Sequence, residues 1–273
     1  MSTDPKFQAR YGAFACVTGA GSGIGEAFAH ALARRGVDLL LADIDAASLE
    51  RVSAAITAVH GVKVERFVGD LAREEEVNAL ADRAEALELG LLISNAGVAS
   101  LGPFLELSLE EQLKALDLHC RASLILTHRL GKKMRARRRG GVILLSSNSA
   151  TLHTPLIANY AATKAYTLAL AEALHMELRE EGVDILALAP GMTETAALRR
   201  SGLDYEKARA LIRPAEEIVE EALGMLGRKP SYISSAGDRF AALFLGRLLP
   251  RSISLRISKA VVGYFYPAIR GSR

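Results

Sequence analysis

The sequence has few cysteines and no long apolar run. Its 273 residues include two cysteines, Cys16 and Cys120, which lie far apart in different predicted elements. This excludes a disulfide framework and a Cys/His metal site, so we expect two reduced thiols and no metal. No stretch of about 18 uninterrupted apolar residues occurs, which excludes a membrane-spanning helix. The N-terminal residues also lack the apolar segment of a signal peptide, so we expect a cytoplasmic protein.

Acidic residues are absent from one end of the chain. Half of the residues are hydrophobic and 24% are charged, as in a soluble globular protein. The formal net charge of +3 is unevenly distributed: seven of the 34 basic residues, and none of the 31 acidic ones, lie between Arg239 and Arg273. The body of the protein is therefore mildly acidic and its tail is basic.

A glycine-rich segment near the N-terminus predicts a nucleotide site. The apolar run at residues 13–18 is followed by TGAGSGIG at 18–25 and by a helical pattern over 26–35. Strand, glycine-rich turn and helix together form the context of a dinucleotide-binding loop. Glycines let the backbone approach a pyrophosphate, and the helix N-terminus supplies N–H donors. The predicted cofactor contacts here are Thr18, Gly19, Ser22, Gly23, Ile24 and Gly25.

The second predicted strand, residues 37–42, ends at Asp43. A carboxylate about 20 residues after the glycine loop can accept hydrogen bonds from the adenosine ribose hydroxyls, and it repels a 2′-phosphate. No basic residue follows it directly, and Ser22 stands where a basic residue would favour phosphate. The pattern predicts NAD as cofactor, with NADP as the alternative.

Strands and helices alternate along most of the chain. Further strands are expected at 62–68, from 91 to Asn95-Ala96-Gly97, and at 141–146, 183–189 and 231–234, and the main helices at 46–59, 73–88, 109–138, 157–181 and 214–226. This alternation predicts an α/β fold with a doubly wound, mostly parallel sheet. Ligands bind beyond the carboxyl ends of such strands, where Asp70 and Leu71 follow a strand. Asp70 either reaches adenine or caps the next helix, and residues 192–213 suit a lid.

A tyrosine and a lysine lie four residues apart in a predicted helix. Tyr160 and Lys164 therefore share one helix face. A nearby positive charge lowers the pKa of a phenol, so the pair can act as a general acid/base. A hydroxyl from the cluster Ser146–Ser149 can hold a substrate oxygen beside the tyrosine; the alternative is a surface Tyr and Lys on an ordinary helix.

Two basic segments have several interpretations. The run from Lys132 to Arg139 ends a predicted helix, where cations complement the helix dipole, so we expect no nucleic acid partner. Residues 238–266 alternate large apolar groups with spaced cations and are expected to form a helical extension. Such a segment lies on an anionic membrane surface, packs on a partner subunit or covers the substrate site. We expect a Rossmann-type domain at 1–235 and this extension at 236–273.

Taken together, the motifs resemble those of the short-chain dehydrogenase/reductase family over residues 12–235. They include the glycine loop, Asp43, Asp70, Asn95-Ala96-Gly97, Ser147 thirteen residues before Tyr160, and Pro190-Gly191 with Thr195. The resemblance implies a single Rossmann-type domain with a seven-stranded parallel sheet. It also implies nicotinamide-dependent oxidation of an alcohol or reduction of a carbonyl, and a homodimer or homotetramer built on helices 109–138 and 157–181.

The resemblance also assigns roles to residues. Tyr160 would be the general acid/base, Lys164 would lower its pKa and bind the nicotinamide ribose, and Ser147 would orient the substrate oxygen, while Ser146 and Ser149 would take no part. Further cofactor contacts would come from Asn95, Ala96, Gly97, Tyr160, Pro190, Gly191, Thr193 and Thr195. His119 stands where the family usually has an asparagine that holds a relay water; it preserves the relay, provides its own route to solvent or marks a weakened enzyme.

The expected function is that of an NAD-dependent dehydrogenase acting on a largely apolar secondary alcohol or ketone. Apolar residues near the expected site motivate this substrate class, namely Leu101, Phe104, Leu152, Leu156 and Ile157. One alternative is an NADP-linked reductase of ketones or 3-oxoacyl thioesters. Another is a cofactor-binding scaffold with weakened catalysis, held at a membrane by its tail.

Overall fold

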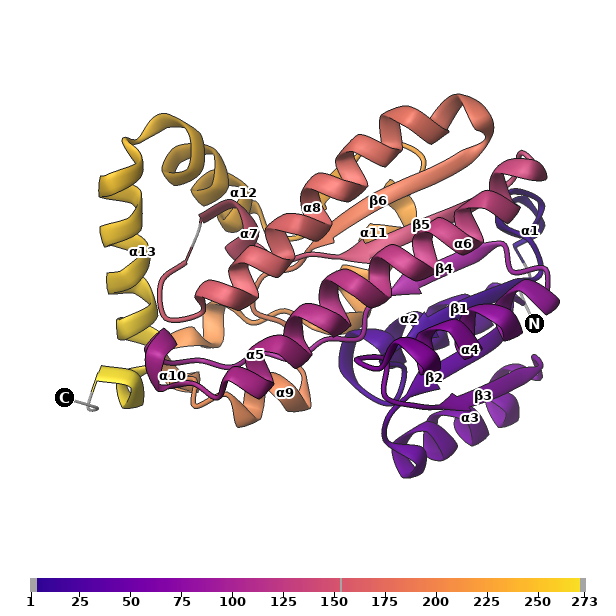
Figure 1. The fold of residues 1–273 in the computed structure, drawn as a ribbon, viewed down its shortest axis with the longest axis horizontal. Coiled ribbons are helices and arrows are strands. Elements are labelled where there is room, and N and C mark those ends of the chain that lie inside the picture. The colour runs from indigo at the N-terminus through magenta and orange to yellow at the C-terminus, as the bar shows by residue number, and fades with distance from the viewer. Residues whose placement is uncertain (1–3, 153, 271–273) are drawn as a thin grey trace.

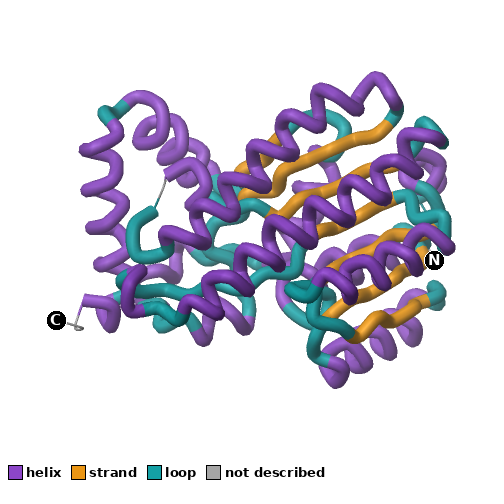
Figure 2. The backbone as a smooth tube through the Cα atoms, in the orientation of Figure 1, coloured by secondary structure: helices purple, strands orange, loops and turns teal. Residues whose placement is uncertain are grey.

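A computed structural model describes residues 4–152 and 154–270. Its centre is one sheet of seven parallel strands in the order β3-β2-β1-β4-β5-β6-β7 (Figures 1 and 2). The strands are β1 (Phe14–Thr18), β2 (Asp38–Asp43), β3 (Val64–Val68), β4 (Leu91–Ser94), β5 (Gly140–Leu145), β6 (Val183–Ala189) and β7 (Ser231–Ile233). The predicted seven-stranded parallel sheet is confirmed: β6 has the predicted bounds, and the ends of the other strands differ from the predicted ones by at most three residues.

Helices cover both faces of the sheet (Figure 1). In chain order the longer ones are α2 (Gly23–Arg34), α3 (Ala46–His60), α4 (Glu74–Ala86), α5 (Leu109–Leu116), α6 (Ser123–Ala136), α8 (Ala158–Leu178), α11 (Ala215–Met225), α12 (Ala236–Leu243) and α13 (Arg251–Phe265). The short ones are α1 (Pro5–Tyr11), α7 (Ser149–Leu152), α9 (Ala196–Arg200) and α10 (Tyr205–Ala208).

The core consists of two apolar layers because successive strand residues point to opposite faces. Val17 and Leu41 face α2, α3 and α11, whereas their neighbours Cys16 and Leu40 face α4, α6 and α8. β1 and β4 are neighbours at the centre, so the chain reverses its direction of strand addition there. Such a switch point is where ligands bind in open α/β sheets.

One predicted helix has an internal irregularity. The expected helix 109–138 is α5, a π-helical turn at Asp117–Ala122, and α6 in direct succession. No breaker residue in this segment signals the turn, so the sequence did not reveal it. π-helical turns inside α-helices frequently mark functional sites. This one carries His119.

The N-terminal helix α1 was not expected, because only Asp4 and Pro5 signal its start. Asp4 caps the helix by accepting a hydrogen bond from the Phe7 N–H. Its far end is fixed by a tertiary contact: Arg10 forms two hydrogen bonds, of 2.9 and 2.7 Å, with Asp184 of β6. The buried Tyr11 hydroxyl also donates to this carboxylate, over 2.9 Å.

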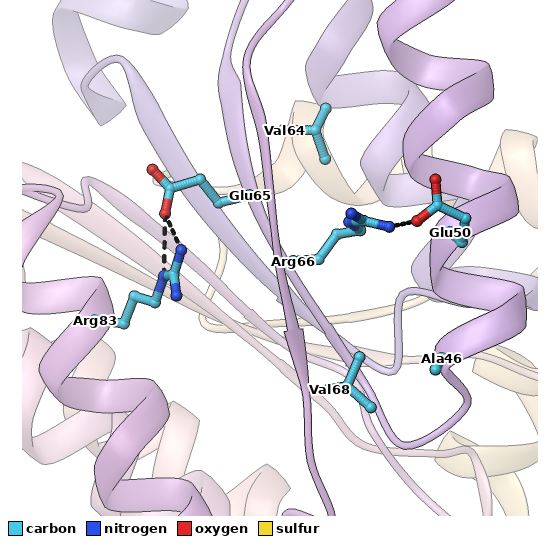
Figure 3. A pocket seen from close by; sticks show the side chains of 7 residues that line it. All are labelled: Ala46, Glu50, Val64, Glu65, Arg66, Val68 and Arg83. Atoms are coloured by element: carbon cyan, nitrogen blue, oxygen red, sulfur yellow. Dashed lines mark hydrogen bonds and ion pairs between the residues drawn. The ribbon is translucent and has the colours of Figure 1, made fainter.

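The edge strand β3 borders an open depression (Figure 3). Its walls carry two ion pairs, Arg83 with Glu65 and Arg66 with Glu50. Charged side chains on an edge strand hinder pairing with another chain. The depression holds none of the predicted site residues, so we assign it no chemistry.

The tail forms α12, a π-helical turn at Phe244–Leu248 and α13, which together stand beside the carboxyl end of the sheet (Figure 1). This confirms the expected helical extension. Arg273 of the basic tail lies outside the described residues. In the described part of the chain, no helix is both long and apolar enough to cross a bilayer.

Candidate active site

The glycine loop after β1 is packed so closely that two of its glycines cannot be replaced. Gly19 has φ +65°, and a Cβ there would lie 2.9 Å from the Cα of Ala96. At Gly25 a Cβ would overlap the carbonyl oxygen of Gly19. A side chain at either position would push the start of α2 away from the loop.

Two predicted residues join this loop to the loop after β4. The Thr18 hydroxyl oxygen accepts hydrogen bonds from the N–H groups of Asn95 and Ala96, both at 3.0 Å. The Asn95 side-chain amide donates to the carbonyl oxygens of Thr18 and Gly19, at 2.9 and 3.2 Å. The two loops at the switch point are therefore held as one unit.

The N-terminus of α2 is suited to a pyrophosphate. Ser22 is its N-cap residue but forms no side-chain capping bond, whereas Asp45 caps α3 by accepting from Ala47 and Ser48. Uncapped N–H groups at a helix N-terminus are donors for an anion. Gly23 begins the helix and Ile24 packs against the core. These residues fit the phosphates of a dinucleotide.

Asp43 lies beside the glycine loop, as expected. Its carboxylate accepts hydrogen bonds from the Gly21 N–H at 2.8 Å and the Asp45 N–H at 3.0 Å. The fold also brings Arg51 of α3 here, where it donates to the Gly21 carbonyl oxygen at 3.0 Å and pairs with Glu26 at 2.7 Å. Sequence reasoning missed this arginine because it lies eight residues beyond Asp43.

Asp70 at the end of β3 is engaged within the protein. It accepts hydrogen bonds from the Ala72 N–H and from the Lys114 ammonium group, at 3.1 and 2.8 Å. Burial raises the pKa of Asp70, but these hydrogen bonds outweigh it and the net shift is downward. Asp70 is not the N-cap of α4, which is Arg73. The Leu71 side chain is buried in the core, so only its backbone is left to meet a ligand.

Three side chains predicted for catalysis meet at the end of β5. Ser147 follows this strand, and α8 carries Tyr160 and Lys164 (Figure 1). The Ser147 hydroxyl lies close enough to Tyr160 to act on the pKa of the phenol. The Lys164 nitrogen lies 5.7 Å from the Tyr160 ring centroid and donates to the Leu145 carbonyl oxygen at 2.7 Å. The fold therefore unites a phenol, a hydroxyl and an ammonium group.

Burial shifts both titrating groups in this cluster. Burial raises the pKa of Tyr160, and the nearby Ser147 hydroxyl opposes this without reversing it. Burial also lowers the pKa of Lys164 to about 8. The expected lowering of the Tyr160 pKa is therefore not found, because burial of the phenol outweighs the opposing effect of Ser147. At neutral pH the pair consists of a phenol and an ammonium group.

Two neighbouring serines support the cluster. The Ser149 hydroxyl and backbone N–H both bond to the Ser147 hydroxyl, at 3.0 and 3.2 Å. The Ser146 hydroxyl donates to the Lys164 carbonyl oxygen at 2.7 Å. Each of these serines therefore contacts a predicted catalytic residue and holds it in place, while the expectation that neither takes part in the chemistry stays a prediction.

Comparison with known proteins agrees with this geometry. The model of the family described as short chain dehydrogenase matches residues 13–206, which include the glycine loop, Ser147, Tyr160 and Lys164. This chain belongs to the short-chain dehydrogenase family. It is accordingly an oxidoreductase acting on CH–OH groups or the corresponding carbonyls.

Relatives of this dehydrogenase carry several names. A very-long-chain 3-oxoacyl-CoA reductase-like protein of Arabidopsis thaliana is 37% identical over 228 residues, covering 82% of this chain and 73% of that protein. The 17-beta-hydroxysteroid dehydrogenase type 3 of Rattus norvegicus is 30% identical, covering 78% of this chain and 68% of the relative.

Solved structures show the same fold. A 7beta-hydroxysteroid dehydrogenase superposes with a TM-score of 0.86 at 23% identity, covering 92% of this chain and 98% of the other. A short-chain dehydrogenase of Sphingobium yanoikuyae in complex with NADPH has a TM-score of 0.77 at 30% identity, covering 84% and 91%.

His119 is where this dehydrogenase departs from the expected family pattern. The Thr163 hydroxyl donates to the Tyr160 carbonyl oxygen at 2.9 Å, so it accepts from the His119 Nδ1 at 2.8 Å. His119 Nε2 is then the acceptor for the Val98 N–H at 3.0 Å. Burial, helped by the charge of Lys164, lowers the pKa of His119 to about 2. The ring is neutral, and both nitrogens are occupied.

The position of the His119 ring explains why residue 97, in the loop after β4, is a glycine. A Cβ at Gly97 would lie 2.9 Å from His119 Nε2, so the ring needs a glycine there. The His119 and Tyr160 rings meet edge to face at 5.7 Å. Through these contacts His119 links the loop after β4 to the catalytic helix, which indicates a positioning role and argues against proton transfer through its ring.

We expect His119→Asn to lower stability and leave the pH dependence of turnover unchanged. The shorter side chain leaves either the Val98 N–H or the Thr163 hydroxyl without its partner, which costs about 1–3 kcal/mol. Thermal unfolding and the pH profile of kcat measure the two effects. A displaced acidic limb of that profile would show instead that the imidazole carries protons.

The loop after β6 lies over the cofactor side. The Pro190 carbonyl oxygen accepts from the Asn148 N–H, and the Thr193 hydroxyl donates to the Gly191 carbonyl oxygen, both at 3.1 Å. Thr195 caps α9, and its methyl group would lie 2.9 Å from a Cβ at Gly23. Through Thr195 this loop thus reaches the glycine loop.

The C-terminal extension contributes residues that sequence reasoning missed. Asp238 accepts from the Asn148 side-chain amide at 3.1 Å, beside Ser147, and its carboxylate leaves no room for a Cβ at Gly191. Tyr266 follows α13 and lies close enough to Tyr160 to raise the pKa of the Tyr160 phenol. No local pattern links these residues to the site, because the chain returns to it only after β7.

Proposed function

We propose that this dehydrogenase interconverts a secondary alcohol and a ketone on a bulky, largely apolar molecule, with NAD as preferred cofactor. The observation that carries the proposal is the cluster of Ser147, Tyr160 and Lys164. It lies at the same carboxyl end of the strands as the glycine loop and the uncapped N-terminus of α2. The bound nicotinamide supplies or accepts the hydride at the substrate carbon.

The chain's own residues handle the proton and the substrate oxygen. The Tyr160 hydroxyl donates a proton to the carbonyl oxygen in reduction and accepts it in oxidation. Ser147, held by Ser149, hydrogen-bonds the same oxygen. Lys164 places a positive charge next to the tyrosine and binds the nicotinamide ribose. The raised pKa of Tyr160 keeps the phenol protonated at neutral pH, which favours reduction.

Apolar side chains support the substrate class. Leu101, Leu152, Leu156 and Ile157 are half-buried around the catalytic loops, and Phe104 is exposed nearby. The Leu156 carbonyl oxygen accepts from the Gly102 N–H at 2.8 Å, which joins two of these segments. An NADP-linked reductase of ketones or 3-oxoacyl thioesters is the second candidate, favoured by the named relatives and the NADPH-bound neighbour.

For cofactor choice, we expect Asp43→Asn to shift preference toward NADP by about tenfold or more. Removing one negative charge near the 2′ position removes a repulsion of about 1–4 kcal/mol. Initial rates with NADH and NADPH measure the ratio. Arg51→Gln is the matched variant, and it should lower the initial rate with NADPH while leaving the rate with NADH unchanged. An unchanged ratio in Asp43→Asn would leave Asp43 without the proposed role.

For pH dependence, we expect the reduction rate to fall as pH rises through about 8. The buried Lys164 is charged below its pKa of about 8 and neutral above it, so its electrostatic support is lost there. The pKa of Tyr160 is raised, so its own deprotonation comes later. The pH profile of kcat/KM tests this, and a flat profile well above pH 8 would contradict it.

We also propose a homodimer through the helices of one face. Large apolar side chains are exposed on α5, α6 and α8, namely Leu109, Leu113, Leu116, Leu124, Tyr166 and Met176. Such a set favours a subunit interface. Sedimentation equilibrium tests the proposal, and a monomer at micromolar concentration would contradict it.

The experiment that tests the proposed function is a reductase and dehydrogenase assay with the full chain. The near-ultraviolet absorbance of the reduced nicotinamide is followed with NAD(H) or NADP(H) and a panel of bulky ketones and secondary alcohols. We expect turnover of apolar ketones. Cofactor binding without turnover across the panel would instead favour a scaffold that has lost catalysis.

A further inference from the structure

The C-terminal helices have an inner face that is fixed to the catalytic loops. Asp238 of α12 binds Asn148 at 3.1 Å, and a Cβ at Gly246 would lie 3.2 Å from the Thr151 carbonyl oxygen. In α13 the residues Ser254, Ser258 and Val262, spaced by four, are buried. The extension therefore packs against the rest of the protein in one fixed orientation. Its exposed side is called the outer face.

The outer face carries large apolar side chains. Phe240 and Leu248 are 67% and 65% exposed, and the Phe240 and Phe244 rings stack with centroids 5.8 Å apart. The exposed apolar set is Phe240, Leu243, Phe244, Leu248, Ile253 and Val261, whereas the exposed Tyr264 ring has the Lys207 ammonium group over it, 5.2 Å from its centroid. Monomeric proteins rarely leave such a group uncovered unless it binds something.

Cations without partners lie on the same helices. Arg247, Arg251, Arg256 and Lys259 are exposed, and no ion pair joins them to any residue that the structure describes. Asp238 is the one acidic residue from 236 to the end of the chain, and it faces inward to Asn148. The outer face therefore combines apolar groups with uncompensated positive charge.

We propose that this outer face docks on the surface of an anionic lipid bilayer. Each Lys or Arg near a negatively charged leaflet contributes about 1 kcal/mol, and apolar side chains enter the headgroup boundary. A second copy of the chain fits poorly, because a two-fold contact between identical faces would oppose cations with cations. An anionic surface offers the complementary charge at every point.

Docking would also bring the catalytic loops close to the lipid. The inner face contacts Asn148 and Thr151, which lie one and four residues after Ser147, so the bilayer would lie one helix layer from the substrate side. This consequence rests on the proposed function, since an apolar substrate would then reach the site from the membrane. The docking itself does not depend on that proposal.

The test is vesicle flotation of the full-length protein without substrate or cofactor. We expect binding to phosphatidylcholine vesicles that contain phosphatidylglycerol, little binding to pure phosphatidylcholine, and release by high salt. The double variant Arg256→Glu/Lys259→Glu should bind at least about tenfold more weakly. Phe240→Ser/Phe244→Ser should also lose binding, while thermal unfolding verifies that both variants are folded.

Matched control residues lie at the amino ends of the strands, opposite the C-terminal helices. Lys132→Glu/Arg139→Glu reverses two exposed cations near the start of β5, and Val59→Ser removes an apolar side chain that is 65% exposed on α3. Both should bind vesicles as the parent does. The proposal is overturned if the parent does not float, if the controls lose as much binding, or if the tail variants change the sedimentation mass without affecting flotation. Turnover of a water-soluble substrate, measured separately, reports on the proposed function alone.

Discussion

Replacing Tyr160 with phenylalanine is expected to reduce kcat by about 10²–10⁴-fold, because the substitution removes the hydroxyl that transfers the proton. The ring keeps its edge-to-face contact with His119 at 5.7 Å, so the local packing should persist. Cofactor affinity should change little, since the ammonium group of Lys164 and the glycine loop remain. Steady-state turnover and cofactor titration by fluorescence measure the two quantities.

A matched control for this variant lies on the same helix. Tyr166 is 38% exposed on α8, and Tyr166→Phe removes a hydroxyl of the same kind outside the cluster. Its turnover should equal that of the parent protein. If Tyr160→Phe retained more than about a tenth of the activity, Tyr160 would not be the general acid. A parallel loss of cofactor binding would point to a structural defect instead.

The second large effect is expected on stability. Arg10→Ala should lower the free energy of unfolding by about 3 kcal/mol, because it leaves the carboxylate of Asp184 buried without its cation. The Asp184 side chain is only 7% exposed, whereas Arg10 itself is 46% exposed, which places the loss at the low end for buried pairs. Denaturant unfolding monitored by circular dichroism measures the difference.

Two variants calibrate this result. Tyr11→Phe removes only the hydrogen bond of 2.9 Å to Asp184 and should cost about 1–2 kcal/mol. Arg83→Ala removes the pair with Glu65 at the open edge of β3, where solvent screens the charges, and should cost less than about 1 kcal/mol. Equal losses in Arg10→Ala and Arg83→Ala would show that burial of Asp184 does not set the cost.

Elements with a strong local signal were predicted well. β6 was expected at 183–189, where the structure has it, because a run that is apolar except for Asp184 is typical of a strand buried on both faces. Helix α1 and the π-helical turn at Asp117–Ala122 were missed. The first is short and depends on a contact between Arg10 and Asp184, which lie far apart in the sequence. The second has no breaker residue to mark it.

The residues of the candidate site also fall into those that a local pattern predicted and those that it did not. The spacing of Tyr160 and Lys164 and the glycine loop were readable because both are local patterns in a helix or turn. Arg51, Asp238 and Tyr266 were not, since their positions depend on how separate segments pack. The direction of the Tyr160 pKa shift was also missed, because burial of a phenol is a tertiary property.

Short-range spacing in the sequence was sufficient to predict the family, the alternation of strands and helices, and the residues expected to transfer the proton and bind the cofactor. Long-range packing was needed to show that His119 is neutral with a hydrogen bond at each ring nitrogen, and that one face of the C-terminal helices is buried while the other is exposed. The hydrogen-bond partners and the burial of a side chain depend on segments that are distant in the chain. An amphipathic pattern therefore does not predict which face of a helix packs against the rest of the protein.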